Sequence, residues 1–510
     1  MTDETSPTRI LSDPGIKRDG TQLEGGGYSD ALWCRFQRGL PRKIGGYQAV
    51  NKYLNSIPRA LHDFTQDLTT YIHAGSDTAV SRFFIDSSGS ASVITNRTPG
   101  ALTINEDNLW QFDALFQAGG ATRLIAQVAP NLSDIANSLG GELYIGDVLG
   151  TAALTSVTIP VGGSATGGIC VLHPYLFYFG NDGYTGWSVA GNPSDLASAG
   201  SGSANPATQK VVRGLPLRGG PGSSPSGIFW SLDAVFRASF VGGSAIFAFD
   251  TLATGTSIMS PNSVIEYNGV FYWLGVDSIL SFNGVVREVP NLMNSNWFFD
   301  NINTDCLQKV FAFKVPRFGE IWWCAPLFGA TEPSHALIYN VRENTWYDTE
   351  LPNGGRSAGI FPSVYRRPLV SGVELGSGTG YKLWVHEIGT DEVDGVTSQP
   401  IQSYFETGEI ALPVLQGKDA ALRVVCVEPD FVQTGEMTMQ ILGRRNARAP
   451  ENDGDIYIFN DVSTEKDALI LHTKEQRRLL RFKFGSNAPG GHYEMGHILA
   501  HLGEGDGRAT

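Results

Sequence analysis

The chain has 510 residues, a formal net charge of −14, and only 17 % charged residues. A protein that binds nucleic acid through its phosphates needs a basic face. The acidic net charge therefore argues against a nucleic-acid-binding protein. It stays compatible with a conduit through which DNA passes without specific binding. The length predicts two or three domains, and 61 glycines with many β-branched and aromatic residues predict a turn-rich, all-β chain.

Residues 1–27 are polar and end in three consecutive glycines, which predicts a flexible N-terminal arm that orders on a neighbouring subunit. Deleting this arm is therefore expected to leave a folded monomer that assembles poorly. The polar start lacks the apolar core of a signal peptide, and no run of about 18 apolar residues predicts a membrane-spanning segment. We expect synthesis in a cytosol and no export by the standard route.

A compact motif follows from Tyr28 to Tyr47, in which an aromatic strand leads to a Gly-Leu-Pro turn, a basic step and a Gly-Gly bend. The basic step comprises Arg35, Arg38, Arg42 and Lys43. Two interpretations stay open for it. The four side chains form a contact with another subunit or an acidic partner, or they belong to a solvated turn.

Units of about 40–50 residues, each with several short strands between turns, occupy most of residues 28–395. This period is typical of β-propellers, and about six to seven units predict a closed ring of blades. Asn-Gly pairs at Asn268 and Asn283 mark hairpin turns. The Gly/Ser/Pro-rich stretch at about 190–226 is predicted to be an insertion or long loop. Only short segments, such as 131–139 and 291–305, are expected to form helix.

Apolar and polar residues alternate strictly in the remaining segment, residues 396–510, as in Met437, Met439 and Ile441. Several antiparallel strands with one buried face predict a C-terminal β-sandwich. The predicted fold class is thus all-β, with a β-propeller followed by an antiparallel β-sandwich.

The sequence contains few patterns that are typical of catalytic or metal-binding sites. It contains no P-loop, zinc-protease, nucleophile-elbow or EF-hand motif. His497 and His501 have the spacing of a zinc-protease pair, but Ile498 stands where that helix needs Glu, so a structural or exposed role is preferred. The five cysteines are widely spaced and predict reduced thiols. We predict no catalytic, metal or cofactor site, no enzyme activity, and Trp and Tyr side chains packed between blades.

The segment from Trp33 to Tyr47 resembles the opening of many phage virion proteins, with its Arg-Phe, Gly-Leu-Pro and Lys-Ile-Gly-Gly-Tyr steps. The middle of the chain is similar to tail-hub or nozzle proteins of short-tailed phages, also called packaged-DNA stabilisation proteins. That similarity rests on Tyr267 to Gly275, on Gly284 to Pro290 and on Ile321-Trp322-Trp323. The run from Arg478 through Gly496 to Arg508 looks like the final sandwich strands of that family.

The resemblance implies a hexamer located in the virion tail, below the portal and adaptor proteins. Such a ring would prolong the DNA channel, retain packaged DNA and dock tail fibres, spikes or a needle. The family has no catalytic residues to carry over to this chain.

Two alternatives stay open at this point. A receptor- or glycan-binding propeller at the tail tip would show exposed Trp clusters in a concave site, whereas buried Trp would favour the hub. A polysaccharide hydrolase, the less favoured alternative, would need a pocket with two carboxylates about 5–9 Å apart.

Overall fold

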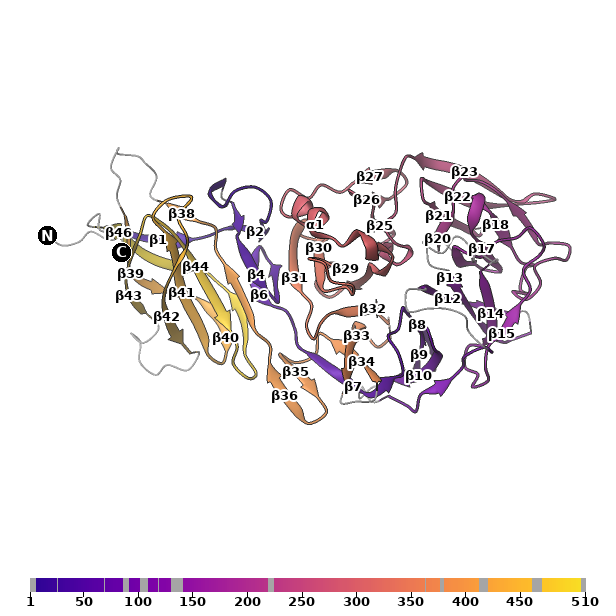
Figure 1. The fold of residues 1–510 in the computed structure, drawn as a ribbon, viewed down its shortest axis with the longest axis horizontal. Coiled ribbons are helices and arrows are strands. Elements are labelled where there is room, and N and C mark those ends of the chain that lie inside the picture. The colour runs from indigo at the N-terminus through magenta and orange to yellow at the C-terminus, as the bar shows by residue number, and fades with distance from the viewer. Residues whose placement is uncertain are drawn as a thin grey trace.

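The computed structural model describes residues 6–24, 26–67, 69–85, 91–100, 109–117, 119–129, 141–218, 224–362, 364–376, 380–411, 421–460 and 470–505. A ring of seven sheets and a β-sandwich lie side by side along the long axis of the molecule (Figure 1). The predicted all-β propeller and sandwich are therefore confirmed. Within the described residues the one α-helix is α1 (Ser295–Asn301), inside the predicted segment 291–305. The other predicted helix, 131–139, lies outside the described residues.

Each of the first six blades is an antiparallel sheet of four consecutive strands. Blades 1 to 3 consist of β8 (Ala60–Gln66), β9 (Thr69–Gly75), β10 (Val80–Ile85) and β11 (Thr95–Asn96); β12 (Leu109–Phe116), β13 (Thr122–Ala129), β14 (Glu142–Asp147) and β15 (Thr155–Val157); β16 (Gly168–Leu172), β17 (Tyr175–Phe179), β18 (Thr185–Trp187) and β19 (Gly202–Ala204). Blades 4 to 6 consist of β20 (Val211–Pro216), β21 (Ser226–Ser231), β22 (Ala234–Gly242) and β23 (Ile246–Thr254); β24 (Ile265–Tyr267), β25 (Val270–Leu274), β26 (Ile279–Phe282) and β27 (Val286–Glu288); β28 (Phe311–Val315), β29 (Glu320–Ala325), β30 (His335–Asn340) and β31 (Thr345–Glu350).

The seventh blade closes the ring with a strand from far upstream in the chain. It contains β32 (Arg356–Ile360), β33 (Leu369–Gly376) and β34 (Gly380–His386), and its fourth strand is β7 (Tyr47–Leu54). β7 runs antiparallel to β34, with Ala49 opposite Trp384. β35 (Asp391–Asp394) and β36 (Thr397–Pro400) extend this sheet. The first strands of the blades contact one another around the axis, and β32 meets β8 to complete the circle.

Aromatic side chains fill the spaces between blades, as predicted. Trp230 of blade 4 and Trp273 of blade 5 share one buried cluster, with ring centroids 5.6 Å apart. The indole N–H groups also link blades, because Trp110 of blade 2 donates to the Ser76 carbonyl beside blade 1. A buried indole therefore contributes both packing and a satisfied hydrogen bond.

The sandwich is built from strands of both chain ends. One sheet contains β1 (Ser6–Ile10), β46 (Ile498–Glu504), β39 (Leu422–Glu428) and β43 (Leu471–Arg477). The second contains β4 (Asp30–Leu32), β37 (Ser403–Glu406), β44 (Leu479–Ser486), β41 (Met437–Arg444) and β42 (Asn452–Phe459), with β38 (Ile410–Ala411) on β44. A smaller sheet contains β40 (Phe431–Thr434), β45 (His492–Met495), β6 (Leu40–Lys43) and β5 (Cys34–Gln37). As the alternation predicts, Met437, Met439 and Ile441 are fully buried.

For the described residues 6–24 and 26–27, the prediction of a flexible arm over residues 1–27 is wrong. β1 pairs with β46, with Ile10 opposite Ile498, and β2 (Asp13–Ile16) pairs with β3 (Gly27–Tyr28). An edge strand takes its hydrogen bonds from its partner, so a short polar segment can be ordered without an apolar signal of its own. Deleting residues 1–27 would therefore remove part of the sandwich.

Two further domain predictions also need correction. The propeller begins at β7, because residues 28–46 supply β4, β5 and β6 to the sandwich sheets. The stretch 190–226 is not an insertion, since it contains the outer strand β19 of blade 3 and the inner strand β20 of blade 4. Small residues in β19 give no period-two apolar pattern, which explains the error.

One continuous hydrophobic cluster joins the two parts of the molecule. It includes Trp322 and Tyr347 of blade 6, Trp384 of blade 7, Trp33 and Phe482. The N-terminal segment from Tyr28 to Ile44 lies at the centre of this cluster. Packing of this kind fixes the propeller against the sandwich.

Candidate functional site at the propeller–sandwich junction

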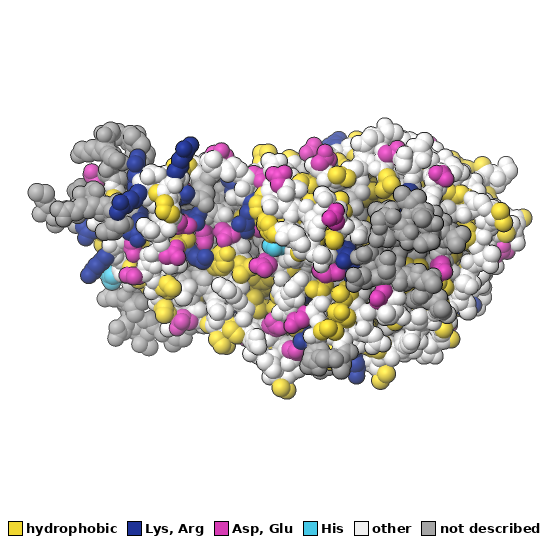
Figure 2. Space-filling model, viewed as in Figure 1, with side chains coloured by type: hydrophobic (Ala, Val, Ile, Leu, Met, Phe, Trp, Pro, Cys, Tyr) yellow, Lys and Arg dark blue, Asp and Glu magenta, His cyan; other side chains and the backbone are white. Residues whose placement is uncertain are grey.

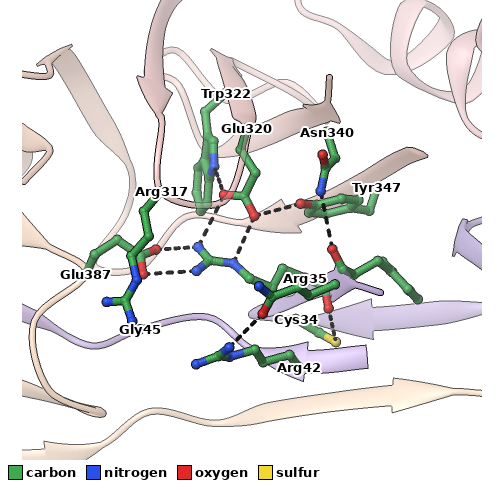
Figure 3. Close-up of polar contacts among 12 residues, drawn as sticks. Cys34, Arg35, Arg42, Gly45, Arg317, Glu320, Trp322, Asn340, Tyr347 and Glu387 are labelled. Carbon is green, nitrogen blue, oxygen red and sulfur yellow. Dashed lines mark hydrogen bonds and ion pairs between the residues drawn. The ribbon is translucent and has the colours of Figure 1, made fainter. Parts of the chain in front are cut away.

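Arg35 is the centre of a buried polar network at the junction. Its side chain is 1 % exposed, and its Nε lies 2.8 Å from the Glu320 Oε1 of β29. Its Nη1 donates to Glu387 Oε2 at 3.0 Å, just after β34, and its Nη2 pairs with the second oxygen of that carboxylate. Figure 3 shows this fork between the two carboxylates. Burial opposes the charge, yet the two carboxylates outweigh burial and raise the pKa of Arg35.

Glu320 is fully buried and accepts two more hydrogen bonds. Trp322 Nε1 donates at 2.8 Å and the Tyr347 hydroxyl donates at 2.7 Å. The carboxylate thereby joins strands β29 and β31 of blade 6 to Arg35 on β5. A buried ion pair is stable only where additional donors satisfy its remaining lone pairs, and this site meets that condition.

Trp33 also links the propeller to the sandwich, through hydrogen bonds of its backbone and contacts of its ring. Its backbone N–H donates to Thr349 of blade 6 at 2.9 Å, and its carbonyl accepts from Ser403 of the sandwich at 3.0 Å. Its ring packs edge-on against Tyr47 and Trp322. The contacts with Thr349, Ser403 and Trp322 bridge segments that lie far apart in the sequence.

The structure corrects the partner-contact hypothesis for two of the four basic residues. Arg35 and Lys43 are both 1 % exposed, so neither reaches another chain. Lys43 Nζ donates to the Gly491 carbonyl at 2.8 Å, and burial lowers its pKa to about 8. Arg42 pairs with Glu494 at 2.9 Å, while the Arg38 side chain is 72 % exposed. For Arg38 and Arg42 the partner-contact hypothesis stays a prediction.

The sequence interpretation missed several residues at this site. Glu320 pairs with Arg35, and a cavity beside Arg35 is lined by Glu387, Phe318, Arg317 and Arg367. They come from blades 6 and 7, and nothing in their spacing ties them to the basic step. The one available signal was charge, because Arg317 and Arg367 stand in turns of an otherwise acidic chain.

The propeller axis encloses a second cavity of about 230 Å³. Asp63, Gln111, Phe313 and Lys314 are among its lining residues. Gln111 Nε2 donates to the carbonyls of Gly167 and Val212, which joins blades 2, 3 and 4. The volume suits a small cluster of water molecules and is far too small for a DNA duplex, whose major groove alone is about 12 Å wide.

Almost all Trp side chains are buried. Of the ten tryptophans in the chain, nine are buried and Trp297 is half-buried. Trp297 lies beside Phe328, which is 59 % exposed, and Arg18 lies 5.0 Å over its ring. The aromatic residues of this propeller therefore serve packing, with one small aromatic cluster at the surface.

On the face shown in Figure 2, Lys and Arg side chains gather over the sandwich. Some arginines of the sandwich strands are paired with acids. Arg444 pairs with Glu409 at 2.9 Å, and Arg481 pairs with Glu451 at 2.6 Å. Such ion pairs reduce the positive field that a phosphate-gripping surface would require.

The remaining sequence candidates are two histidines at strand β46 and the five cysteines. His501 Nε2 lies 2.6 Å from Glu428 on the neighbouring strand β39, and His497 precedes β46. All five cysteines are free, as predicted. Among the described residues, no cluster of three or more His, Cys, Asp or Glu could hold a metal ion. No helix in the described ranges is long and apolar enough to cross a membrane.

The chain was compared with protein-family models, curated proteins and solved structures. No protein-family model matches the chain, and no curated protein matches it. A solved structure described as the WD40 beta propeller domain of Doa1 is similar at 10 % sequence identity and a TM-score of 0.40. That match covers 67 % of this chain and 97 % of the Doa1 chain.

Proposed function

We propose that this chain is a non-enzymatic structural protein of a bacteriophage tail, a hub or nozzle subunit in the virion. In this role it extends the DNA channel below the portal and adaptor, retains packaged DNA and offers docking surfaces to fibres, spikes or a needle. The observation that carries the proposal is the position of the motif from Trp33 to Tyr47. This motif resembles phage virion proteins, and its side chains lock the propeller to the sandwich.

The distribution of aromatic residues supports a hub over a glycan-binding tip. Carbohydrate sites present aromatic faces to solvent, and here nine of ten Trp side chains are buried. Four cavities among the described residues are each lined by at most one carboxylate, so none of these four supports a two-carboxylate hydrolase.

The propeller axis has no room for DNA, so a conduit has to lie between copies of the chain. The net charge of −14 suits a protein that lines such a conduit, because an acidic surface does not bind DNA tightly. A ring of copies, six by the resemblance, would enclose this channel.

A receptor-binding role is the second candidate, favoured by one observation. Trp297, Phe328 and His335 form an aromatic cluster at the surface, with the Phe328 and His335 rings 5.2 Å apart. Aromatic platforms of this kind can hold the apolar faces of sugars or proteins.

One binding experiment separates the two candidates. The purified chain is tested for co-sedimentation with a portal–adaptor complex and for binding to host glycans, alongside Phe328→Ala. The hub proposal predicts binding to the adaptor that Phe328→Ala leaves unchanged. Glycan binding that Phe328→Ala abolishes, without adaptor binding, would replace it with the receptor-binding candidate.

A further inference from the structure

A basic cavity of about 300 Å³ lies between the propeller and the sandwich, next to the Arg35 network; we call it the junction cavity. Its lining includes five cationic side chains and one carboxylate, that of Glu387: the cations are Arg35, Arg42, Lys43, Arg317 and Arg367. In a chain of net charge −14, this local excess of cations needs a physical explanation.

Acidic partners balance only part of this charge. Arg35 is paired with Glu320 and Glu387, and Arg42 is paired with Glu494. Lys43 and Arg367 instead donate to neutral backbone carbonyls, those of Gly491 and Glu387. Asp391 acts on Lys43 electrostatically, although its own carboxylate accepts from the Gly490 N–H.

Arg317 is exposed at the cavity rim, in the turn between β28 and β29. Within the described part of the chain, no ion pair is formed by Lys43, Arg317 or Arg367. Three cationic groups consequently face the cavity without a carboxylate in ion-pair contact.

Three guanidinium groups lie close to the ring of Phe318. The guanidinium carbons of Arg35, Arg317 and Arg42 lie 3.7, 5.2 and 5.4 Å from the centre of its ring. Figure 3 shows the Arg317 side chain ending beside the Arg35–Glu387 pair. Burial lowers the pKa of the Arg42 guanidinium, and repulsion by the charges of Arg35 and Arg317 also lowers it.

We propose that the junction cavity is an oxyanion-binding site for one compact carboxylate or phosphate group. Arg317 and Arg367 would supply the donors at the rim, and Lys43 would add positive charge beneath them. Guanidinium groups match the planar fork of a carboxylate or phosphate, and charge-assisted hydrogen bonds are the strongest available to such a ligand. The cavity volume admits one such group with a few waters and excludes a DNA backbone.

The test is calorimetric titration of the full chain with inorganic phosphate, against chloride of equal ionic strength. Arg317→Gln and Arg367→Gln remove one rim charge each, and Arg287→Gln removes an exposed arginine on β27 as the matched control. We expect the two rim variants to bind phosphate at least about tenfold more weakly, and the control to bind as the unaltered chain does.

Two results would overturn the site: no phosphate-specific heat with the unaltered chain, or the same loss in Arg287→Gln as in the rim variants. Particle mass measured with increasing phosphate then separates the two sources of ligand. A mass that falls as phosphate binds identifies a carboxylate of a neighbouring copy as the usual occupant. A mass that stays constant identifies the free anion. The proposal concerns this chain's own cations and does not depend on the tail role.

Discussion

Arg35 lies in a strand formed within the first forty residues, whereas its carboxylate partners lie 285 and 352 residues later in the chain. The sequence indicates that this residue belongs to a basic step, and it leaves open what the step binds. The structure places its partners inside the same chain, on blades 6 and 7. Spacing along a sequence carries no information about ion pairs between domains, so Glu320 and Glu387 could not be predicted.

Replacing Arg35 tests how much the buried network contributes to stability. Arg35→Met leaves Glu320 buried without a cationic partner, and we expect a loss of about 3–5 kcal/mol in the free energy of unfolding. Arg38→Met, on the same hairpin but with a 72 % exposed side chain, should change it by less than about 1 kcal/mol. Urea unfolding of both variants checks this, and equal losses would contradict the network's role.

Asp63 makes the stability of the propeller depend on pH. Burial raises its pKa to about 6, whereas an unfolded Asp titrates near 3.9. The folded chain therefore binds more protons between these values, and ionisation of Asp63 costs stability as pH rises from about 4 to 6. We expect Asp63→Asn to be about 1–2 kcal/mol more stable than the unaltered chain at pH 7, with little difference at pH 4.

Chemical unfolding at the two pH values measures the Asp63 effect. Asp277→Asn, at an exposed position between β25 and β26, is the control and should differ little from the unaltered chain at either pH. A gain for Asp63→Asn that is the same at pH 4 and pH 7 would show that the carboxyl is not responsible.

β7 and β1 are the elements that the sequence could least predict. The blade strands and the sandwich strands follow local alternation and hairpin turns, so their existence and order are readable from the sequence. Ring closure by β7 and edge addition by β1 depend on partners that lie hundreds of residues away. No local pattern distinguishes such a strand from the first strand of an ordinary blade or from a polar arm.

A buried and an exposed position of β7 test its role in closing the ring. Val50 is 2 % exposed and packs in a cluster with Leu369 and Leu383 of blade 7. Val50→Asp would bury an unpaired carboxylate there, and we expect at least about 3 kcal/mol of destabilisation. Gln48→Asp, at an exposed position on the same strand, should be close to neutral.

Hydrogen exchange shows where the ring opens in these variants. In Val50→Asp the amides of β34 should lose protection ahead of those of blades 2 to 5, because β34 is the direct partner of β7. Equal loss of amide protection in all blades would mean that the propeller unfolds as one unit. It would contradict a particular role of β7 in closing the ring.

At the scale of the whole molecule, the chain is one block in which the propeller, the sandwich and both chain ends interlock. A continuous core crosses from blades 6 and 7 into the sandwich, and N-terminal strands belong to both parts. The axial cavity of about 230 Å³ leaves no passage for DNA inside one copy. The tail role therefore requires several copies around a common channel.

The most direct test of the tail proposal is the particle mass and symmetry of the purified chain, by mass photometry and negative-stain imaging with and without a portal–adaptor complex. The account predicts a six-fold ring, alone or on the adaptor, with a mass about six times the 55.0 kDa of one chain. A persistent monomer or trimer that ignores the adaptor and binds host cells or glycans would contradict it.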